Sequence, residues 1–161
     1  MILILFAAMS VACGQRSADG STESNDFSTY SGERYSFEYP KNWEVKRDVN
    51  YMIELYVGTP DFGIAILSFE SDYSLDELYE EMADNSKSSG ISTTDKFACS
   101  IAGCAAYRNV ELTNVYSQTA KYIVYSFKRG RRFYCVKIGN ITSAKQEKLA
   151  DEIMDSFVLK R

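Results

Sequence analysis

Apolar and polar side chains alternate, residue by residue, in several short segments of the chain. In the segment YSFEY, the apolar residues Tyr35, Phe37 and Tyr39 alternate with the polar residues Ser36 and Glu38. Residues two apart point to the same face of a β-strand, so the alternation predicts strands with one buried face. This pattern restricts the chain to a fold built mainly on a β-sheet.

Similar segments recur along the sequence. We expect strands over 35–39, 50–57, 63–70, 91–98, 103–112, 116–127 and 131–138. Pro40 ends the first of them, whereas Ile64 to Leu67 run without alternation, as in a central strand that is covered on both faces. The links between consecutive strands are short, which favours antiparallel pairing.

Two segments carry the start signals of helices. Ser74 and Glu77 have the spacing of a capping box, and Ser143 and Gln146 repeat it near the end of the chain. Apolar residues at helical spacing follow each box: Leu75, Leu78, Tyr79, Met82 and Ala83 in the first, and Leu149, Ala150, Ile153, Met154 and Phe157 in the second. The chain is therefore predicted to form an α+β fold, an antiparallel sheet of about six to seven strands flanked by two helices.

The outer face of the first predicted helix is rich in carboxylates. Asp76, Glu77, Glu80, Glu81 and Asp84 lie there, and such a cluster raises the question of a cation site. Helical spacing spreads these side chains around a solvated face, without the convergent oxygen ligands that calcium needs. We expect no metal site at this helix.

The N-terminal segment predicts export. Met1 to Ala12 is apolar except for Ser10, and it is shorter than the roughly 20 residues of a membrane-spanning helix. Cys13 follows directly, an arrangement that resembles the lipobox of bacterial lipoproteins, in which this cysteine carries the lipid. Ser10 stands where lipoboxes usually have an aliphatic residue, so an ordinary secretory signal, or a buried strand with an unrelated cysteine, is the alternative.

A polar segment separates this region from the rest. Residues 14–26 contain no aromatic or large aliphatic side chain, so they cannot bury enough surface to offset the entropy of ordering. We therefore assign 1–12 to a signal peptide, 13–29 to the lipidated cysteine with a flexible tether, and 30–161 to a single globular domain.

Histidine is absent from the 161 residues. The chain thus lacks the commonest general base near neutral pH and the commonest metal ligand. Its formal net charge of −4 offers no basic field for nucleic acid. No GxSxG elbow, phosphate-binding glycine loop or metalloprotease motif occurs either. We expect no enzymatic activity, no metal, no cofactor and no nucleic-acid partner.

Three further cysteines lie in the predicted domain. Cys99 and Cys104 flank an expected turn over 100–103, and a disulfide could join them if their Cβ atoms lie opposite each other. The alternative is that both are reduced, as expected for Cys135 between Tyr134 and Val136, which has the pattern of a small buried residue.

The segment KRGRR is the one dense basic patch. Lys128, Arg129, Arg131 and Arg132 surround Gly130 and could contact an anion, a lipid headgroup or an acidic partner. The alternative is a solvated hairpin turn in which Gly130 supplies a positive φ.

Three segments resemble the PsbP-like family, including its small bacterial lipoprotein and DcrB-like relatives. They are YSFEYPKNWEV, SIAGCAAY and LADEIMDSFVL, and the likeness extends over about Tyr30 to Leu159. The resemblance implies a PsbP-like α/β/α sandwich and an accessory or scaffold role. The shared residues look structural, and they are Tyr39, Pro40, Trp43, Gly103 and Phe157.

These observations predict a membrane-anchored, noncatalytic accessory or interaction domain of the bacterial cell envelope. It would face the periplasm or the exterior, attach to the membrane through the N-terminal lipid and bind an envelope protein. Aromatic residues make up 14% of the chain, so the alternative is a small-molecule or glycan-binding lipoprotein that uses exposed aromatic side chains. An enzyme that works with carboxylates or tyrosine alone is a third hypothesis.

Overall fold

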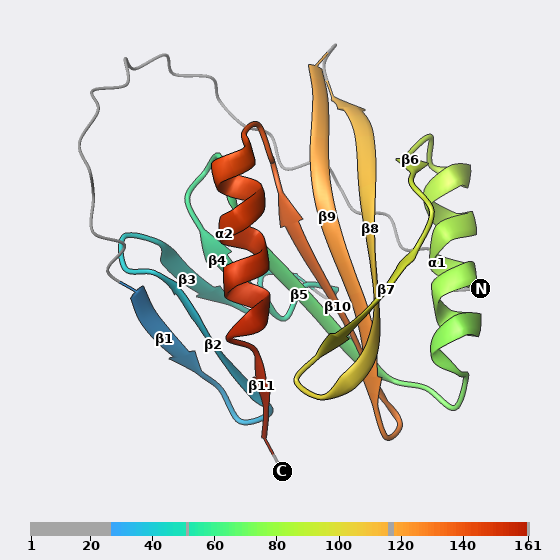
Figure 1. Cartoon of the computed structure of the whole chain (residues 1–161), viewed down its shortest axis with the longest axis horizontal. Helices are drawn as coiled ribbons and strands as arrows, with labels where there is room; N and C mark the ends of the chain where they lie inside the picture. Colours follow the sequence, from blue (N-terminus) through green and yellow to red (C-terminus); the bar gives the residue numbers. More distant parts are fainter. Residues whose placement is uncertain (1–26, 51, 116–117, 161) are drawn as a thin grey trace.

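A computed structural model of the chain describes residues 27–50, 52–115 and 118–160 (Figure 1). Its main element is an eight-stranded sheet of order β3-β4-β5-β10-β9-β8-β6, with β7 also paired to β8. All of these pairs are antiparallel. The strands are β3 (Glu44–Arg47), β4 (Leu55–Gly58), β5 (Gly63–Glu70), β6 (Ser92–Thr93), β7 (Phe97–Ile101), β8 (Cys104–Val115), β9 (Gln118–Arg129) and β10 (Arg132–Gly139).

A second, three-stranded antiparallel sheet joins segments from the two ends of the described chain. It consists of β1 (Phe27–Ser31), β2 (Tyr35–Pro40) and β11 (Val158–Leu159), in the order β1-β2-β11. β1 includes residues 27–29, which the sequence analysis placed in the tether. That boundary is therefore corrected, because these residues pair with β2.

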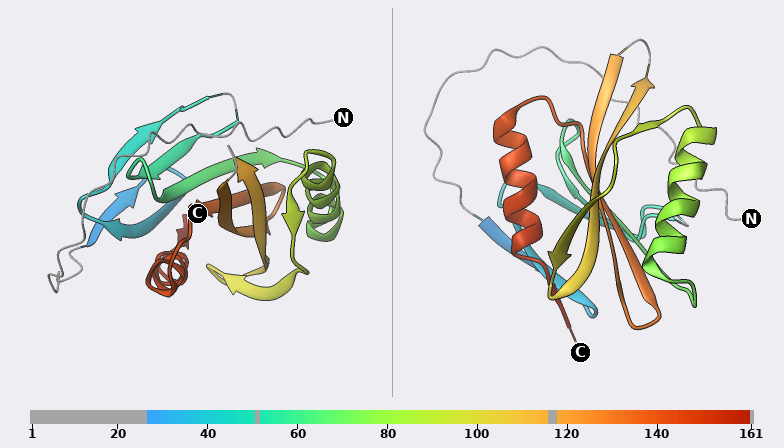
Figure 2. Two further views of the ribbon diagram at one scale, coloured as in Figure 1. Left: turned by 90° about the horizontal axis from the view of Figure 1, so that it is seen from above. Right: turned by 45° about the vertical axis from the view of Figure 1, so that its right-hand side comes forward.

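Two helices, α1 (Leu75–Ser88) and α2 (Ala144–Asp155), cover opposite faces of the large sheet (Figure 2). The neighbouring residues Ile123 and Val124 of β9 show this, because Ile123 packs in the core cluster of α2 and Val124 in that of α1. The predicted α+β fold, with an antiparallel sheet between two helices, is confirmed. The two sheets together contain more strands than the six or seven expected.

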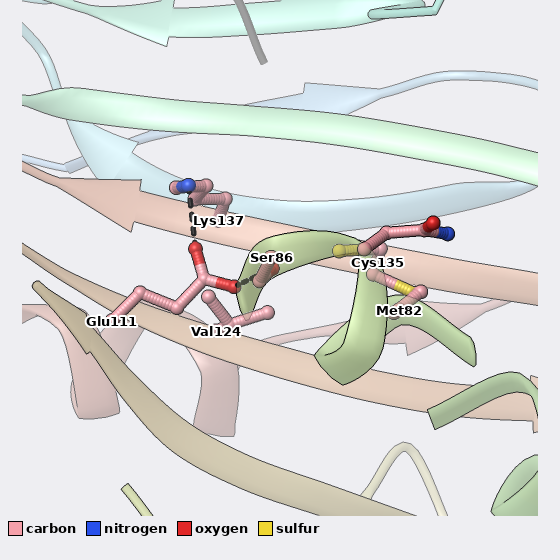
Figure 3. Close-up of a pocket in the computed structure, with 7 residues that line it drawn as sticks. Met82, Ser86, Glu111, Val124, Cys135 and Lys137 are labelled. Carbon is pink, nitrogen blue, oxygen red and sulfur yellow. Dashed lines mark hydrogen bonds and ion pairs between the residues drawn. The ribbon is translucent and has the colours of Figure 1, made fainter. Parts of the chain in front are cut away.

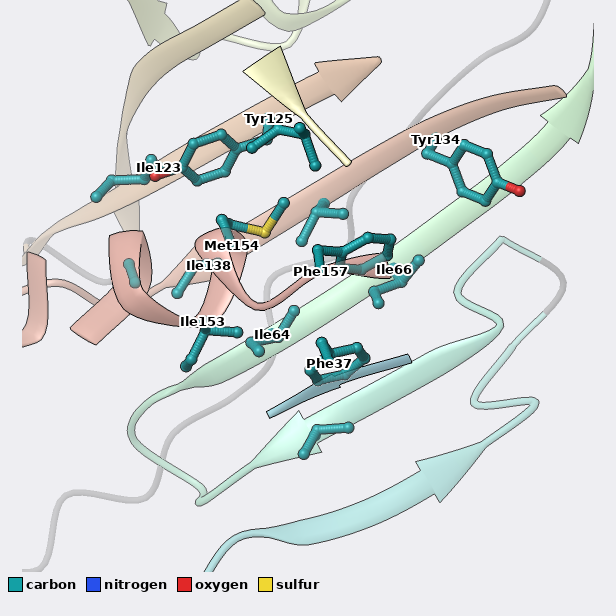
Figure 4. Packing of buried hydrophobic residues seen from close by; sticks show 14 of the residues in the cluster. Phe37, Ile64, Ile66, Ile123, Tyr125, Tyr134, Ile138, Ile153, Met154 and Phe157 are labelled. Carbon is teal, nitrogen blue, oxygen red and sulfur yellow. The ribbon is translucent and has the colours of Figure 1, made fainter. Parts of the chain in front are cut away.

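The main core lies between the large sheet, α2 and the small sheet (Figure 4). Phe157, just after α2, stacks on Phe37 of β2 with ring centroids 5.6 Å apart and contacts Phe127 of β9 at 5.5 Å. Trp43 is also buried and meets Phe62 edge to face at 5.2 Å. The structural roles expected for Trp43 and Phe157 are thus confirmed.

The smaller core under α1 is different, because it contains polar side chains. Leu78 of the helix packs with Val124, Phe133 and Cys135 of the sheet. Four buried polar side chains lie in the central strands, and the strand register places them on this same face: Asn109, Glu111, Ser126 and Lys137. β10 is buried on both faces from Phe133 to Ile138, so it, more than β5, is the central strand.

Two strand predictions are corrected. The strand expected over 50–57 begins only at Leu55, because the Asn50 Oδ1 atom accepts hydrogen bonds from the backbone N–H groups of Met52 and Ile53 and forms a loop. The strand expected over 91–98 is divided into β6 and β7. β3 was not predicted at all, since its four side chains are exposed and show no buried alternation.

Both helices begin at the predicted N-cap residues, but the predicted capping box is complete only at α1. At α1 the Ser74 Oγ atom accepts from the Glu77 backbone N–H at 3.2 Å, and the Glu77 Oε2 atom accepts from the Ser74 backbone N–H at 2.7 Å. At α2 only the first of these bonds forms with Ser143, because the Gln146 Oε1 atom accepts instead from the backbone N–H of Thr142.

Candidate functional site

The predicted lipid-attachment residue, Cys13, lies outside the described residues. None of the described helices is long and apolar enough to cross a membrane. Lipidation of Cys13 therefore stays a prediction from the sequence.

The Cys99–Cys104 disulfide is not formed in the structure. Cys99, Cys104 and Cys135 are free thiols, of which Cys135 is buried and the other two are partly exposed. Cys99 lies opposite Ala106 and Cys104 lies opposite Ile101, so the two cysteines are diagonal neighbours. Diagonal Cα atoms are about 7–8 Å apart, beyond the span of a relaxed disulfide.

The position of the turn explains this offset. Ala102 and Gly103 form the two-residue turn between β7 and β8, with φ angles of 50° and 76°. A two-residue turn with positive φ at both positions is of the type that favours glycine. Because Gly103 fixes the turn at 102–103, the strands pair two positions away from the register that would place the cysteines opposite each other.

The basic residues around Gly130 lie on the β9–β10 hairpin and contact neighbouring segments. Arg131 forms an ion pair with Asp72 at 2.8 Å, and Arg132 one with Glu70 at 2.8 Å. Arg129 donates to the backbone oxygen of Leu159 at 3.0 Å, and Lys128 to that of Tyr73. Gly130 has the predicted positive φ, 58°. All four cations thus have acceptors within the domain, and contact with an external anion stays a prediction.

The acidic face of α1 is partly neutralised by Lys96. The Lys96 Nζ atom lies 2.9 Å from Asp76 Oδ1 and 3.1 Å from Glu80 Oε1, and 4.6 Å from the centroid of the Tyr107 ring. The hydrogen bond from Lys96, followed by one from Tyr107, lowers the pKa of Asp76. Within the described part of the chain, no group of acidic or cysteine side chains could hold a metal ion.

A buried ion pair lies beneath α1 (Figure 3). The Lys137 Nζ atom is 2.6 Å from Glu111 Oε2, and the Ser86 hydroxyl of α1 donates to Glu111 Oε1 at 3.1 Å. The enclosed space beside them measures about 10 Å³, room for one water molecule at most. Burial raises the pKa of the adjacent Cys135 thiol to about 12. This closed site has no room for a substrate.

A larger, open cleft lies between the β1–β2 turn and the loop from β3 to β4. Its volume is about 250 Å³. Its lining is polar and aromatic, and comprises Tyr30, Gly32, Glu33, Arg34, Tyr35, Arg47, Asp48 and Glu54. We take this cleft as the candidate site because several charged and aromatic side chains converge on it.

Glu54 organises one wall of the cleft. It accepts hydrogen bonds from the Tyr35 hydroxyl at 2.7 Å, the Ser68 hydroxyl at 2.8 Å and the Arg34 guanidinium at 2.9 Å. Burial, and then the bond to Glu54, raise the pKa of Tyr35 above its usual range, so this hydroxyl stays protonated and acts as a donor. The hydrogen bonds to Glu54 therefore fix the side chains of this wall.

The sequence analysis missed the cleft and the buried ion pair. The cleft residues come from three separate segments, and none of these segments carries a motif for ligand binding or catalysis. Glu111 and Lys137 occupy strand positions on different strands that only the sheet register brings together. The alternation pattern would have placed both on one face, but it cannot show which strands are neighbours.

No protein-family model matches the chain, and no curated protein sequence is significantly similar to it. Solved structures do match. The cyanobacterial PsbP protein (CyanoP) of Synechocystis sp. PCC 6803 aligns with a TM-score of 0.65 at 15% identity, over 89% of this chain and 98% of that protein. The domain therefore has a PsbP-like fold, as the resemblance of the sequence implied.

Two further structures show how widely this fold occurs. LpqN of Mycobacterium tuberculosis, described as involved in cell envelope biogenesis, has a TM-score of 0.56 at 8% identity, over 84% of this chain and 91% of LpqN. The Ran-binding protein Mog1p of Saccharomyces cerevisiae has a TM-score of 0.58 at 13% identity, over 83% of this chain and 95% of Mog1p. At these identities the likeness establishes the fold alone.

Proposed function

We propose that this protein is a membrane-tethered, noncatalytic interaction domain of the bacterial cell envelope. The observation that carries the proposal is the change of character at Cys13. An apolar run ends there, a polar segment follows, and the first strand of the described residues begins at Phe27. Lipid chains on Cys13 would contribute about 0.8 kcal/mol per buried methylene and hold the domain at the membrane surface.

The partners of several ionisable groups in the domain support a noncatalytic role. Glu111, Lys137 and Glu54 all have partners within the domain. The Cys135 thiol is buried and keeps its proton at neutral pH, and the chain contains no histidine to activate a nucleophile. Among the structural neighbours, LpqN is described as involved in cell envelope biogenesis and Mog1p as a Ran-binding protein. Neither description names a reaction.

The test is fractionation and cross-linking of the full-length protein in its native membranes. We expect the parent protein in the membrane fraction, with a cross-linked protein partner that is lost when Cys13→Ala releases the domain. Cys104→Ala is the matched control, because it removes a partly exposed thiol from the domain and leaves the predicted anchor intact.

The two parts of the proposal fail separately. If Cys13→Ala stays with the membrane as the parent does, the tether is wrong. If the parent is tethered but yields no partner that depends on Cys13, the interaction role is wrong.

A second candidate function, binding of a small molecule, is favoured by the open cleft. Tyr30 and Tyr35 contribute aromatic surface to it, beside charged groups from two loops. Glycan binding usually places a flat aromatic face against the sugar, and here the Tyr30 ring is covered by the Arg47 guanidinium at 5.5 Å from its centroid. A charged ligand therefore suits the cleft better than a neutral sugar.

A further inference from the structure

The polar side chains of the cleft divide into two groups. In the first group, Arg34, Tyr35 and Glu54 satisfy one another, with Ser68 as a fourth member. These side chains form the wall described above. The Glu54 carboxylate is paired with Arg34 and accepts from Tyr35 and Ser68, so these side chains mainly shape the cleft.

The second group lies at the rim and is charged without internal pairing. In the described part of the chain, Arg47 forms no ion pair with Glu33, Asp48 or Glu54, although all four line the same cleft. The Arg47 guanidinium lies over the Tyr30 ring, which leaves its N–H groups available at the edge of the stack. The rim thus presents one cation and two carboxylates.

The rim is held in place before any ligand binds. Asp48 has a φ of 49°, and its backbone N–H donates to the backbone carbonyl oxygen of Glu54 at 2.9 Å. The Asn50 side chain accepts hydrogen bonds from the backbone N–H groups of Met52 and Ile53 in the same loop. On the opposite side, the Tyr30 ring packs on Gly32 so closely that a Cβ atom there would lie 2.8 Å from the tyrosine oxygen. A preorganised site loses less entropy on binding.

We propose that this cleft binds a small zwitterionic ligand that carries a carboxylate and an ammonium group. Arg47 would receive the carboxylate, for which a planar guanidinium is the best donor, and Asp48 with Glu33 would receive the ammonium. A simple anion can pair only with Arg47 and a simple cation only with the two carboxylates, whereas a ligand with both charges can place each of them beside an opposite charge.

The size of the cleft limits the ligand. Its volume of about 250 Å³ is slightly below the roughly 300–1,000 Å³ of sites for drug-sized molecules. An amino acid or a dipeptide fits this size class. This inference does not depend on the membrane tether, because it concerns binding by the domain itself.

The test is isothermal titration calorimetry of the purified full-length protein with four forms of one dipeptide, alanylalanine. The forms are the free zwitterion, the N-acetylated anion, the C-amidated cation and the doubly blocked neutral molecule. We expect the zwitterion to bind at least about tenfold more tightly than any blocked form, because each block removes one charge-assisted contact.

Two variants and one control test which cleft residue contacts each charge of the dipeptide. Arg47→Gln is expected to weaken binding of the zwitterion about tenfold or more, and to leave the C-amidated form little changed. Asp48→Asn is expected to weaken binding of the zwitterion and to leave binding of the N-acetylated form unchanged. Asparagine tolerates the left-handed φ at this position, so the loop should keep its conformation. Lys46→Gln is the matched control, since Lys46 neighbours Arg47 on β3 but does not line the cleft.

Two outcomes would overturn the proposal. One is that the zwitterion binds no more tightly than the blocked forms, which includes the case in which it does not bind at millimolar concentration. The other is a loss with Lys46→Gln as large as with Arg47→Gln, which would indicate unspecific surface charge. The comparison of the four forms on the parent protein decides the question even if a variant fails to fold.

Discussion

Lys137 and Glu111 form an ion pair in which both side chains are at least 91% shielded from solvent. Replacing Glu111 by Gln would leave a buried ammonium without its carboxylate. We expect the free energy of unfolding to fall by about 3–5 kcal/mol, the usual effect of breaking a buried pair. Urea denaturation measures this change.

Glu152→Gln provides the matched control for the buried pair. Glu152 pairs with Lys148 on the outer face of α2, where both side chains are exposed. We expect a change within about 0.5 kcal/mol, because exposed i,i+4 pairs contribute little. If Glu111→Gln is as mild as the control, Lys137 does not depend on this carboxylate.

Cys135 predicts a loss of stability at alkaline pH. Its pKa is about 12 in the folded domain and about 8.5 in an unfolded chain, so between these values only the unfolded state loses the proton. The contribution of the thiol to stability is complete below about pH 8.5 and falls by up to about 1.4 kcal/mol per pH unit above it. Urea unfolding at a series of pH values measures this slope.

The comparison with Cys135→Ala isolates this effect from the tyrosines, which also titrate at high pH. The cavity left by the substitution lowers stability equally at all pH values, so only the slope should differ. We expect the parent to lose stability more steeply than Cys135→Ala above about pH 8.5. Identical slopes would show that water reaches the thiol in the native state.

At the scale of single elements, the β7–β8 turn contains a residue that does not suit its conformation. Ala102 has a φ of 50° and is exposed. A left-handed conformation costs alanine about 1–2 kcal/mol, whereas asparagine adopts it more readily. We expect Ala102→Asn to stabilise the domain by about 1 kcal/mol in thermal or urea unfolding.

The neighbouring glycine gives the opposite test. Gly103 has a φ of 76°, and nothing lies within 4 Å of a Cβ atom placed there. Gly103→Ala should therefore destabilise the domain through backbone strain alone. Should both substitutions destabilise, the turn does not have the geometry described here.

The elements that the sequence predicted well are those specified by local signals. The helix at Ser74 was predicted because its capping box and apolar spacing lie within one short segment. β3 was missed because a short edge strand with exposed side chains needs no buried alternation. The pairing of Cys99 with Cys104 was not predicted correctly, because the turn is centred one residue further along the chain than expected. Such a shift changes every cross-strand pair.

At the scale of the whole molecule, Phe157 joins the two sheets. Its ring lies 5.2 Å from that of Tyr35 and 5.6 Å from that of Phe37 in the small sheet, and 5.5 Å from that of Phe127 in the large sheet. We expect Phe157→Ala to lower the free energy of unfolding by about 3–5 kcal/mol. Far-UV and near-UV circular dichroism should both report the earlier transition.

Phe97→Ala is the control for this prediction, because the Phe97 side chain is 74% exposed. The same chemical change there should alter stability by no more than about 0.5 kcal/mol. If the far-UV and near-UV transitions of Phe157→Ala separate, the domain does not unfold as one cooperative unit.

The candidate site could not be predicted from the sequence, because it depends on how the two sheets pack together. Tyr30, Arg34, Arg47 and Glu54 become neighbours only when the small sheet packs beside the β3–β4 hairpin. Each residue alone has the character of an ordinary surface residue. The fold class followed from alternation and caps, but the juxtaposition of two loops depends on tertiary packing that no local pattern encodes.

The small sheet also determines when the domain can finish folding. β11 pairs with β2, and the backbone N–H of Glu38 donates to the Ser156 hydroxyl across 118 positions of the chain. Closing so long a loop is slow, and it cannot begin before β11 has left the ribosome or the translocation channel. Until then Phe37 has no Phe157 to cover it. A nascent chain of this kind would remain an open intermediate with exposed aromatic side chains, the state that chaperones recognise.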